Sequence, residues 1–282
     1  MAPEQKKSEP AKTPKQLAAE ARAASEAAEK RRERTIRIVG AAVVVLVVAG
    51  LLAVGFFAGK DDDGGSSANP APTADPNAPA PSGVSGENWG VPYGTGWTSP
   101  DEAKLPTLEI WQDFQCPACA SVESAGGAQI QALADEGKVK LLYRPAIFLD
   151  ASLATDNTAN GNPNSSARAT NAWGCAIDAG KAAEYHQGVF AMQPTDEGVG
   201  YSDQQLLDLA SEVGITGADL TTFTTCYTEG TYLPWSANSQ QAFVDSGAGG
   251  TPTGYLNGTE LDSSQLADAE ALAQLIEDAT AK

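Results

Sequence analysis

The fold of this 282-residue chain is decided by the stretch Trp111-Gln112-Asp113-Phe114-Gln115-Cys116-Pro117-Ala118-Cys119. The residues from Leu108 to Gln112 have the apolar character of a buried strand, and the small and apolar residues from Cys116 to Asp135 predict a helix. Cys116 and Cys119 are therefore expected where a strand gives way to the first turn of a helix.

That position favours sulfur chemistry. The first helical turn has unpaired amide groups and the positive end of the helix dipole, and both stabilise a thiolate on Cys116. Pro117 suits the first helical position because its missing N–H would have no partner there. A thiolate attacks disulfides and is also a good leaving group. The two intervening residues, Pro117 and Ala118, let the sulfurs of Cys116 and Cys119 meet within one turn.

Other uses of a C-x-x-C pair fit this sequence less well. No metal site is expected, because Cys175 and Cys226 do not form a second close pair and the single histidine, His186, is distant. A purely structural disulfide between Cys116 and Cys119 would close almost no loop, so it would stabilise the fold little.

The elements around this stretch follow the order β-α-β, a mainly helical segment, and then β-β-α. Their expected positions are Val139 to Tyr143 for the second strand, Ser166 onward for the helical segment, Asn257-Gly258 for a hairpin turn and Gln265 to Ala279 for the last helix. The sequence thus predicts one α/β domain over about 195 residues, which is enough for a sizeable core.

The motif around the cysteines resembles that of the DsbA-like thiol:disulfide oxidoreductases of the thioredoxin-like superfamily, whose strand commonly runs into D-F-x-C-P-x-C. The later Gly250-Thr251-Pro252-Thr253 is similar to the cis-proline loop of the same family. The resemblance implies a thioredoxin-like fold over residues 87–282 with an embedded helical insertion over about 150–247. It also implies a catalytic pair, Cys116 and Cys119, that needs no further cofactor, and a cis Thr251-Pro252 bond that binds substrate against this pair.

Two departures from the family bear on the chemistry. The dipeptide Pro117-Ala118 tunes the active site, and the strongest oxidants of the family have a histidine where this chain has Ala118, so we expect a less oxidising couple. Many members place a buried acid six residues before the first cysteine, where this chain has Ile110. The neighbouring Glu109 should face the other side of the sheet. Proton transfer to Cys119 would then depend on water or another group.

The other cysteines lie 51 positions apart in the helical segment. We expect Cys175 and Cys226 to form a structural disulfide, with a second redox relay as the alternative. His186 is expected to be a packed or surface residue rather than a catalyst, and Trp111, Trp173 and Trp235 are expected in the core.

The part of the chain before the domain has three regions. Residues 1–37 are a charged tail, residues 38–58 form an uncharged stretch long enough to cross a bilayer as a helix, and residues 59–86 are a Pro, Ala, Gly and Ser-rich linker that we expect to be disordered. A cleaved signal peptide is the alternative for residues 38–58, but the apolar run is long for one. Basic residues before the stretch and acidic residues after it predict a single pass with the N-terminus in the cytoplasm.

Charge and cysteine content agree with an extracytoplasmic domain. Residues 1–60 contain 11 Lys and Arg and 6 Asp and Glu, whereas the rest of the chain contains 7 and 30. So acidic a domain would repel phosphate backbones, which argues against nucleic acid as a partner. All four cysteines lie on the outer side, where disulfides persist.

These expectations lead to one functional hypothesis and two alternatives. The first is a membrane-anchored, bacterial oxidoreductase that introduces disulfides into exported proteins with free thiols, and the resemblance implies a quinone-linked membrane oxidase that recharges it. The first alternative is a reductase or isomerase that is held reduced. The second is a tethered chaperone or binding module with an inert disulfide.

Overall fold

The computed structural model describes residues 71–84 and 89–280. The predicted tail 1–37, the predicted membrane span 38–58 and much of the predicted linker 59–86 lie outside these residues. Within the described ranges, no helix is both long and apolar enough to cross a membrane.

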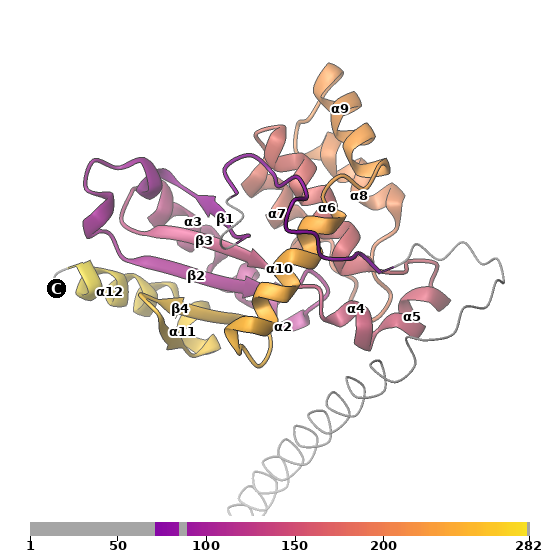
Figure 1. Cartoon of the computed structure of the whole chain (residues 1–282). Coiled ribbons are helices and arrows are strands. Elements are labelled where there is room, and N and C mark those ends of the chain that lie inside the picture. Colours follow the sequence, from indigo (N-terminus) through magenta and orange to yellow (C-terminus); the bar gives the residue numbers. More distant parts are fainter. Residues whose placement is uncertain (1–70, 85–88, 281–282) are drawn as a thin grey trace, which may run out of the picture. The chain divides into compact units, whose positions relative to one another are not determined.

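A five-stranded mixed sheet forms the centre of the domain (Figure 1). The strand order is β1-β3-β2-β4-β5, in which β2 and β3 run parallel and the other neighbours run antiparallel. The strands are β1 (Val91–Tyr93), β2 (Thr107–Gln112), β3 (Lys140–Pro145), β4 (Thr253–Leu256) and β5 (Thr259–Leu261). The strand that leads to the cysteines is therefore the central one, paired on both sides.

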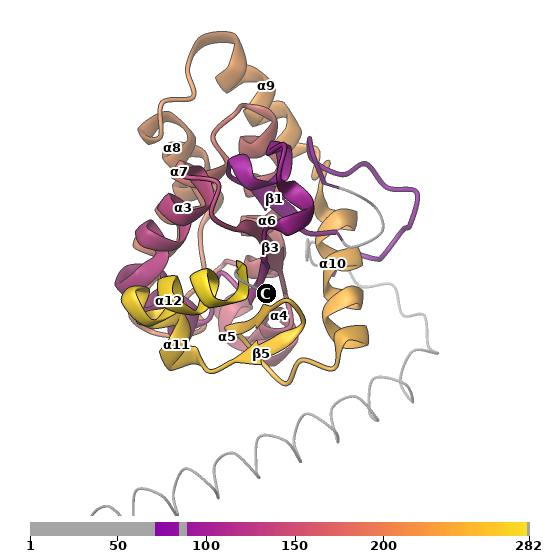
Figure 2. The same ribbon diagram turned by 90° about the vertical axis from the view of Figure 1, so that its left-hand side faces the viewer.

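Alternation along β2 gives the sheet two different faces. Leu108 and Ile110 are fully buried in the main core, whereas Trp111 contacts Phe243 of α10 (Leu233–Ser246), with ring centroids 5.4 Å apart. Figure 2 shows α10 on one side of the sheet and α3, α11 and α12 on the other. Both faces are covered, so the end of β2 is shielded from solvent.

The helix predicted over 116–135 contains a change of pitch. It consists of α2 (Pro117–Val122), the π-helical turn η3 (Glu123–Gly127) and α3 (Ala128–Asp135). Small residues make this turn possible: a Cβ atom on Gly126 would lie 2.9 Å from the carbonyl oxygen of Leu266, and one on Gly127 would collide with the carboxylate of Glu123. Glu123 is the first residue of this turn, and its carboxylate lies over Gly127.

The helical segment between β3 and β4 has two roles. Its elements are α4 (Leu149–Ser152), α5 (Ala154–Ala159), α6 (Ser165–Asp178), α7 (Ala182–Ala191), α8 (Asp203–Glu212), α9 (Gly217–Thr228) and α10. Helices α6 to α9 pack together as the expected insertion, whereas α10 also covers the second face of the sheet. The predicted bounds 150–247 thus include one helix that belongs to the sheet layers.

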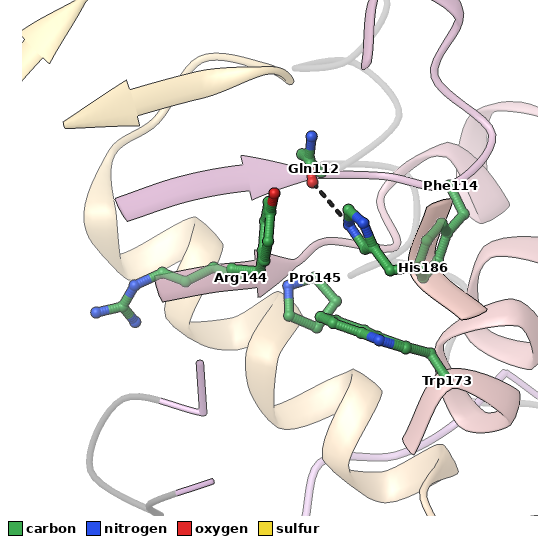
Figure 3. A pocket seen from close by; sticks show the side chains of 7 residues that line it. Gln112, Phe114, Arg144, Pro145, Trp173 and His186 are labelled. Carbon is green, nitrogen blue, oxygen red and sulfur yellow. Dashed lines mark hydrogen bonds between the residues drawn. The ribbon is translucent and has the colours of Figure 1, made fainter. Parts of the chain in front are cut away.

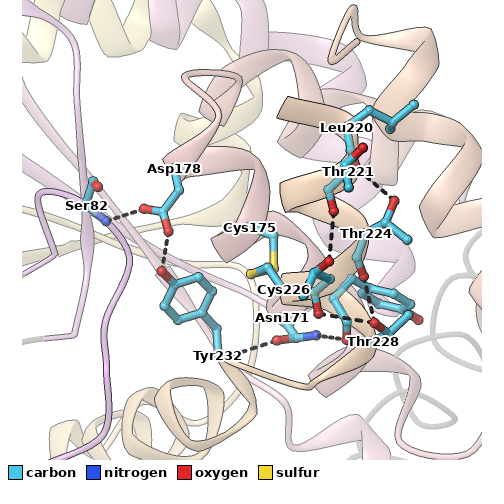
Figure 4. Close-up of a disulfide and its surroundings, with 12 residues drawn as sticks. Ser82, Asn171, Cys175, Asp178, Leu220, Thr221, Thr224, Cys226, Thr228 and Tyr232 are labelled. Carbon is cyan, nitrogen blue, oxygen red and sulfur yellow. Dashed lines mark hydrogen bonds between the residues drawn. A yellow bond between two sulfur atoms is a disulfide. The ribbon is translucent and has the colours of Figure 1, made fainter. Parts of the chain in front are cut away.

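A disulfide joins two helices of the insertion. Cys175 on α6 is bonded to Cys226 on α9 (Figure 4). Beside it, the side chain of Asn171 accepts a hydrogen bond from the amide of Tyr232 at 2.8 Å and donates one to the carbonyl of Tyr227 at 3.1 Å. The bond and the amide bridge together attach α9 and the loop after it to α6.

Part of the predicted linker packs against the domain. The amide of Ser82 donates to Asp178 at 2.9 Å, and the side chain of Asn238 donates to the carbonyl of Asp75 at 2.6 Å. Pro81 is buried. Residues 71–84 therefore differ from the expected free linker, because these hydrogen bonds and the packing of Ala80 and Val84 against the core attach the segment to the domain.

The chain closes as two helices instead of the one predicted over 265–279. They are α11 (Ser263–Ala267) and α12 (Ala269–Thr280), separated at Asp268, whose backbone is extended. The carboxylate of Asp268 accepts the amide of Ala271 at 3.1 Å and so starts the second helix. The predicted order of elements and the α/β fold with a helical insertion are confirmed.

Candidate active site

Both cysteines of the C-x-x-C pair lie at the end of β2, where α2 begins. Cys116 is the residue before the first helical position, Pro117 occupies that position, and both sulfurs are thiols in this structure. Cys116 is 8% exposed and Cys119 is fully buried. Only the first sulfur can therefore meet another protein directly.

The two thiols have opposite acidities. The pKa of Cys116 is lowered to about 6, chiefly by a hydrogen bond from the Cys119 thiol. Burial opposes this shift, and the backbone amides of Cys119 and Ala118 add to it. Burial raises the pKa of Cys119 well above its ordinary value, and the neighbouring Cys116 raises it further. At neutral pH the pair therefore holds its negative charge on the outer sulfur.

The loop after α10 closes over the first cysteine. The Thr251-Pro252 peptide bond is cis, and the Cys116 thiol donates to the carbonyl oxygen of Thr251 at 3.2 Å. The loop and the cysteine pair are 135 residues apart in the chain, and their meeting is the arrangement that the resemblance predicts. Thr253 holds the loop from within by donating its hydroxyl to Gly250 at 2.7 Å.

A buried polar network fixes the turn before Cys116. Asp113 accepts hydrogen bonds from the amides of Gln115 at 3.0 Å and Leu149 at 3.1 Å, and from the hydroxyl of Ser166 at 2.6 Å. The Gln115 side chain donates to Ser166 and to Asp150. This network connects the motif to the starts of α4 and α6.

Asp150 is the second acid of that network. Its two oxygens accept the amides of Ser166 at 2.8 Å and Ala167 at 2.9 Å, which places a carboxyl at the N-terminus of α6. Burial raises the pKa of Asp113 to about 8, with the nearby Asp150 as the second cause, and burial raises the pKa of Asp150 to about 6. Two buried acids this close do not both ionise readily near neutral pH.

A third buried acid lies on the cysteine helix. Glu123 follows Cys119 by one helical turn, and its side chain is only 4% exposed. Its Oε1 accepts a hydrogen bond from the Gln112 side chain at 2.6 Å, while its Oε2 has no hydrogen-bond partner. Burial raises the pKa of Glu123 to about 7, against the opposing effect of Gln112.

Gln112 also contacts the chain's single histidine (Figure 3). His186 Nε2 lies 3.0 Å from Gln112 Oε1, whereas His186 Nδ1 has no partner and lies 4.0 Å from Glu123 Oε2. Because the amide oxygen only accepts, Nε2 carries the proton and Nδ1 is left with its lone pair. The three side chains form a nearly closed ring, which we call the Glu123 ring.

Aromatic residues surround the imidazole. Phe114, Tyr143, Trp173 and Phe190 have ring centroids between 4.4 and 5.6 Å from that of His186. Burial lowers its pKa to about 3, so the ring stays neutral. His186 is thus a packed residue, one of the two outcomes expected from the sequence, and the three predicted core tryptophans, Trp111, Trp173 and Trp235, are buried.

The position six residues before Cys116 carries no acid. Ile110 is fully buried on the face of the sheet that α2 covers, and Glu109 points to the other face, where it pairs with Arg144 at 2.7 Å. The expected separation of these two side chains by the strand's alternation is therefore observed. No cluster of metal-ligating side chains occurs among the residues that the structure describes.

A family model described as thioredoxin matches residues 100–278, well over half of the chain. The chain belongs to the thioredoxin family. Solved structures of thiol-disulfide oxidoreductases share the fold of this thioredoxin-family protein. MdbA from Actinomyces oris is 21% identical, with a TM-score of 0.56 over 73% of this chain and 95% of that one.

Two further structures agree. BdbD from Bacillus subtilis is 21% identical, with a TM-score of 0.54 over 76% of this chain and all of that one. The DsbA of Mycobacterium tuberculosis in its oxidised form is 23% identical, with a TM-score of 0.52 over 68% and 93%. No curated protein matches this thioredoxin-family chain in sequence. The thioredoxin-like fold with a helical insertion is confirmed.

Sequence reasoning missed the polar residues behind the cysteines. Glu123 could have been found, because the fourth residue after Cys119 shares its helix face and an acid on a buried face is unusual. Asp150 and Ser166 could not, because nothing local indicates that they meet Asp113 across the fold. Gln112 was counted only as the end of a strand.

The acidity of Cys116 can be measured directly. In the reduced protein, the rate of alkylation by iodoacetamide should rise with a midpoint near pH 6, because only the thiolate reacts. Cys116→Ser should remove this phase, and Cys119→Ala should move its midpoint upward, since the main hydrogen-bond donor to Cys116 is removed. A midpoint near the ordinary value for a free thiol would contradict the arrangement described here.

The buried acids predict a fall in stability above neutral pH. Asp113 and Glu123, with folded pKa values of about 8 and 7, keep protons that the unfolded chain has already lost. The folded state then binds more protons, so the free energy of unfolding falls as pH rises. His186 acts in the opposite sense, but only below about pH 6.5. Between pH 6.5 and 8 the loss should be on the order of 2 kcal/mol.

Urea unfolding of the oxidised protein, in which Cys116 does not titrate, measures this loss. Glu123→Gln should remove roughly a third of it, because the neutral amide has no proton to lose. Glu136→Gln, at the exposed end of α3, is the matched control and should leave the slope unchanged. An unfolding free energy that is constant from pH 6.5 to 8 would show that the buried acids titrate normally.

Proposed function

We propose that this protein is a thiol:disulfide oxidoreductase that introduces disulfides into exported proteins. The observation that carries the proposal is the unequal pair, in which Cys116 is acidic and reachable while Cys119 is buried and weakly acidic. An inert structural disulfide has no need of this asymmetry, whereas exchange with a substrate depends on it.

The exchange proceeds in two displacements. A substrate thiolate attacks the sulfur of Cys116 in the Cys116–Cys119 disulfide, the S–S bond breaks, and Cys119 leaves and takes up a proton. A second substrate thiolate then attacks the substrate sulfur of the mixed disulfide, and Cys116 leaves as a thiolate. The substrate dithiol has become a disulfide, and the enzyme pair has gained the two electrons.

The low pKa of Cys116 supports the oxidising direction. A stabilised thiolate favours the reduced form of the enzyme, which makes its disulfide a stronger oxidant. Ala118 beside Cys119 works the other way, because it lacks the histidine that the strongest oxidants of the DsbA-like family have there. We therefore place the couple on the oxidising side but below those members, with a reductase or isomerase as the second candidate.

Substrate and recycling partners follow from the same site. Thr251 and Pro252 lie against Cys116 and would hold an extended substrate strand by backbone contacts. The substrates are exported proteins with free thiols. Reoxidation needs an electron acceptor, and we propose a quinone-linked membrane oxidase.

The proposed location is the outer side of a cell membrane. Residues 38–58 would anchor the chain as a single helix, with residues 1–37 in the cytoplasm and the domain from about residue 87 outside. The sequence pattern supports this arrangement. Cell fractionation tests it: the full chain should remain with carbonate-washed membranes, and a chain without residues 38–58 should not.

Trapping tests the exchange itself. Cys119→Ser removes the resolving sulfur, so Cys116 should accumulate in mixed disulfides with exported proteins, visible as reducible adducts on gels. Cys116→Ser is the matched control and should give none. If Cys119→Ser gives no more adducts than this control, the pair is inert and the binding-module alternative gains support.

The direction is decided by the thiol state in cells. Acid quenching followed by alkylation with a mass-adding maleimide should show Cys116 and Cys119 mostly as a disulfide, because an oxidase is kept in its oxidised form between reactions with substrate. Cys175 and Cys226 provide an internal reference, since their bond should be present in either case. A mostly reduced Cys116–Cys119 pair would refute the oxidase and favour the reductase or isomerase.

A further inference from the structure

The proposed exchange leaves a proton unaccounted for at Cys119. This sulfur is fully buried, so it must take up a proton when the disulfide opens and release it when the disulfide re-forms, without direct access to solvent. The position where related enzymes keep an acid holds Ile110, which cannot exchange protons. Water or another group in the protein has to do so, and buried acids are the protein groups suited to it.

Three buried acids lie near the pair, and two of them already accept hydrogen bonds on both carboxyl oxygens. Both oxygens of Asp113 accept hydrogen bonds, from Gln115, Ser166 and Leu149. Both oxygens of Asp150 do the same, with partners at the start of α6. These carboxyls hold the motif against the insertion. Neither has an oxygen without a hydrogen bond that could take up a proton from Cys119.

Glu123 differs from them in its position and in its unused oxygen. Its amide N–H donates to the carbonyl of Cys119, so the two residues are one helical turn apart, and both side chains are buried. Side chains four positions apart on a helix are neighbours, with Cβ atoms about 5–6 Å from each other. The free Oε2 of Glu123 is thus in the same buried layer as the Cys119 sulfur.

We propose that Glu123 is the proton donor and acceptor for Cys119. When the disulfide opens, the Glu123 carboxyl gives its proton to the departing Cys119 thiolate. When Cys119 attacks a mixed disulfide on Cys116, its proton passes to the Glu123 carboxylate, the new S–S bond forms and the bound thiol leaves. The inference rests on the proposed function and adds a residue to it.

The Glu123 ring explains how this carboxyl can keep a proton. Gln112 holds Oε1, and the lone pair of His186 Nδ1 is the nearest acceptor recorded for a proton on Oε2, at 4.0 Å. Both atoms lack hydrogen-bond partners now, and a closer approach of the protonated carboxyl to the imidazole would satisfy both. The π-turn and Gly127 leave the space in which the carboxyl lies.

The surrounding groups do not compete for the proton near neutral pH. The titratable groups recorded beside the Glu123 carboxyl are Tyr143 on β3 and His186 on α7, and Cys119 lies one helical turn before it. The turn η3 also packs against α11, which has no titratable side chain. Burial holds the pKa of Tyr143 well above and that of His186 well below neutrality. Glu123, with a pKa of about 7, is matched to transfer at the working pH.

The test measures ring closure by Cys119. Reduced full chain in mild detergent is mixed with one equivalent of 5,5′-dithiobis(2-nitrobenzoate) and followed at 412 nm in a stopped flow. The first release of thionitrobenzoate places the reagent on Cys116, and the second reports the attack of Cys119 on that mixed disulfide. In the wild type, the second rate should rise with pH and level off above about pH 7 as Glu123 ionises.

Glu123→Gln should slow the second release at pH 7 by about 10- to 100-fold, and the rate should continue to rise through pH 9 because hydroxide replaces the carboxylate. Glu123→Asp keeps the carboxyl and should restore part of the rate together with the bend. Glu136→Gln, exposed at the end of α3, is the matched control and should behave as the wild type. Circular dichroism checks that each variant is folded.

Each other outcome has a definite meaning. A Glu123→Gln protein with the wild-type rate and pH profile overturns the proposal, and so does a wild-type profile without a bend between pH 5 and 9, which requires no variant. If the wild type shows no second release, Cys116 and Cys119 do not exchange, and the proposed function itself fails.

Discussion

The hydrogen bonds that Asp113 accepts hold the end of the central strand against the helical insertion. Asp113 lies between the end of β2 at Gln112 and the start of α2 at Pro117. The backbone amides in this buried segment have no strand or helix partners, so they need other hydrogen-bond acceptors. The carboxyl group of Asp113 accepts the amides of Gln115 and Leu149, and its oxygen bonded to Gln115 also accepts the hydroxyl of Ser166 on α6. The place of Cys116 relative to the cis-proline loop depends on this junction.

The same junction separates the environments of the two sulfurs. Cys116 lies before the helix, where amides and the neighbouring thiol stabilise charge, whereas Cys119 lies two residues into the helix and within the apolar layer. A difference of a few positions along one turn therefore gives one sulfur that ionises and one that does not. The unequal acidity of the two sulfurs comes from where the helix starts and needs no additional charged side chain.

The sequence was sufficient for features that depend on local patterns. The strand from Leu108, the helix start at Pro117, the Asn257-Gly258 hairpin and the order of elements followed from periodicity and turn chemistry. The π-turn did not, because its position depends on close packing of Gly126 against α11. The contacts of Asp113 with Asp150 and Ser166 bring together residues that are far apart in the chain, and single-sequence patterns do not contain that information.

The aromatic cage around His186 affects how solution data on this protein are to be interpreted. Imidazole is the side chain to which a midpoint between pH 5 and 8 is ordinarily assigned. This chain has one imidazole, and its surroundings keep it uncharged over that whole range. Any side-chain midpoint near neutrality, whether from kinetics, fluorescence or calorimetry, therefore belongs to a carboxyl or a thiol, and assigning it to histidine by habit would misplace the active group.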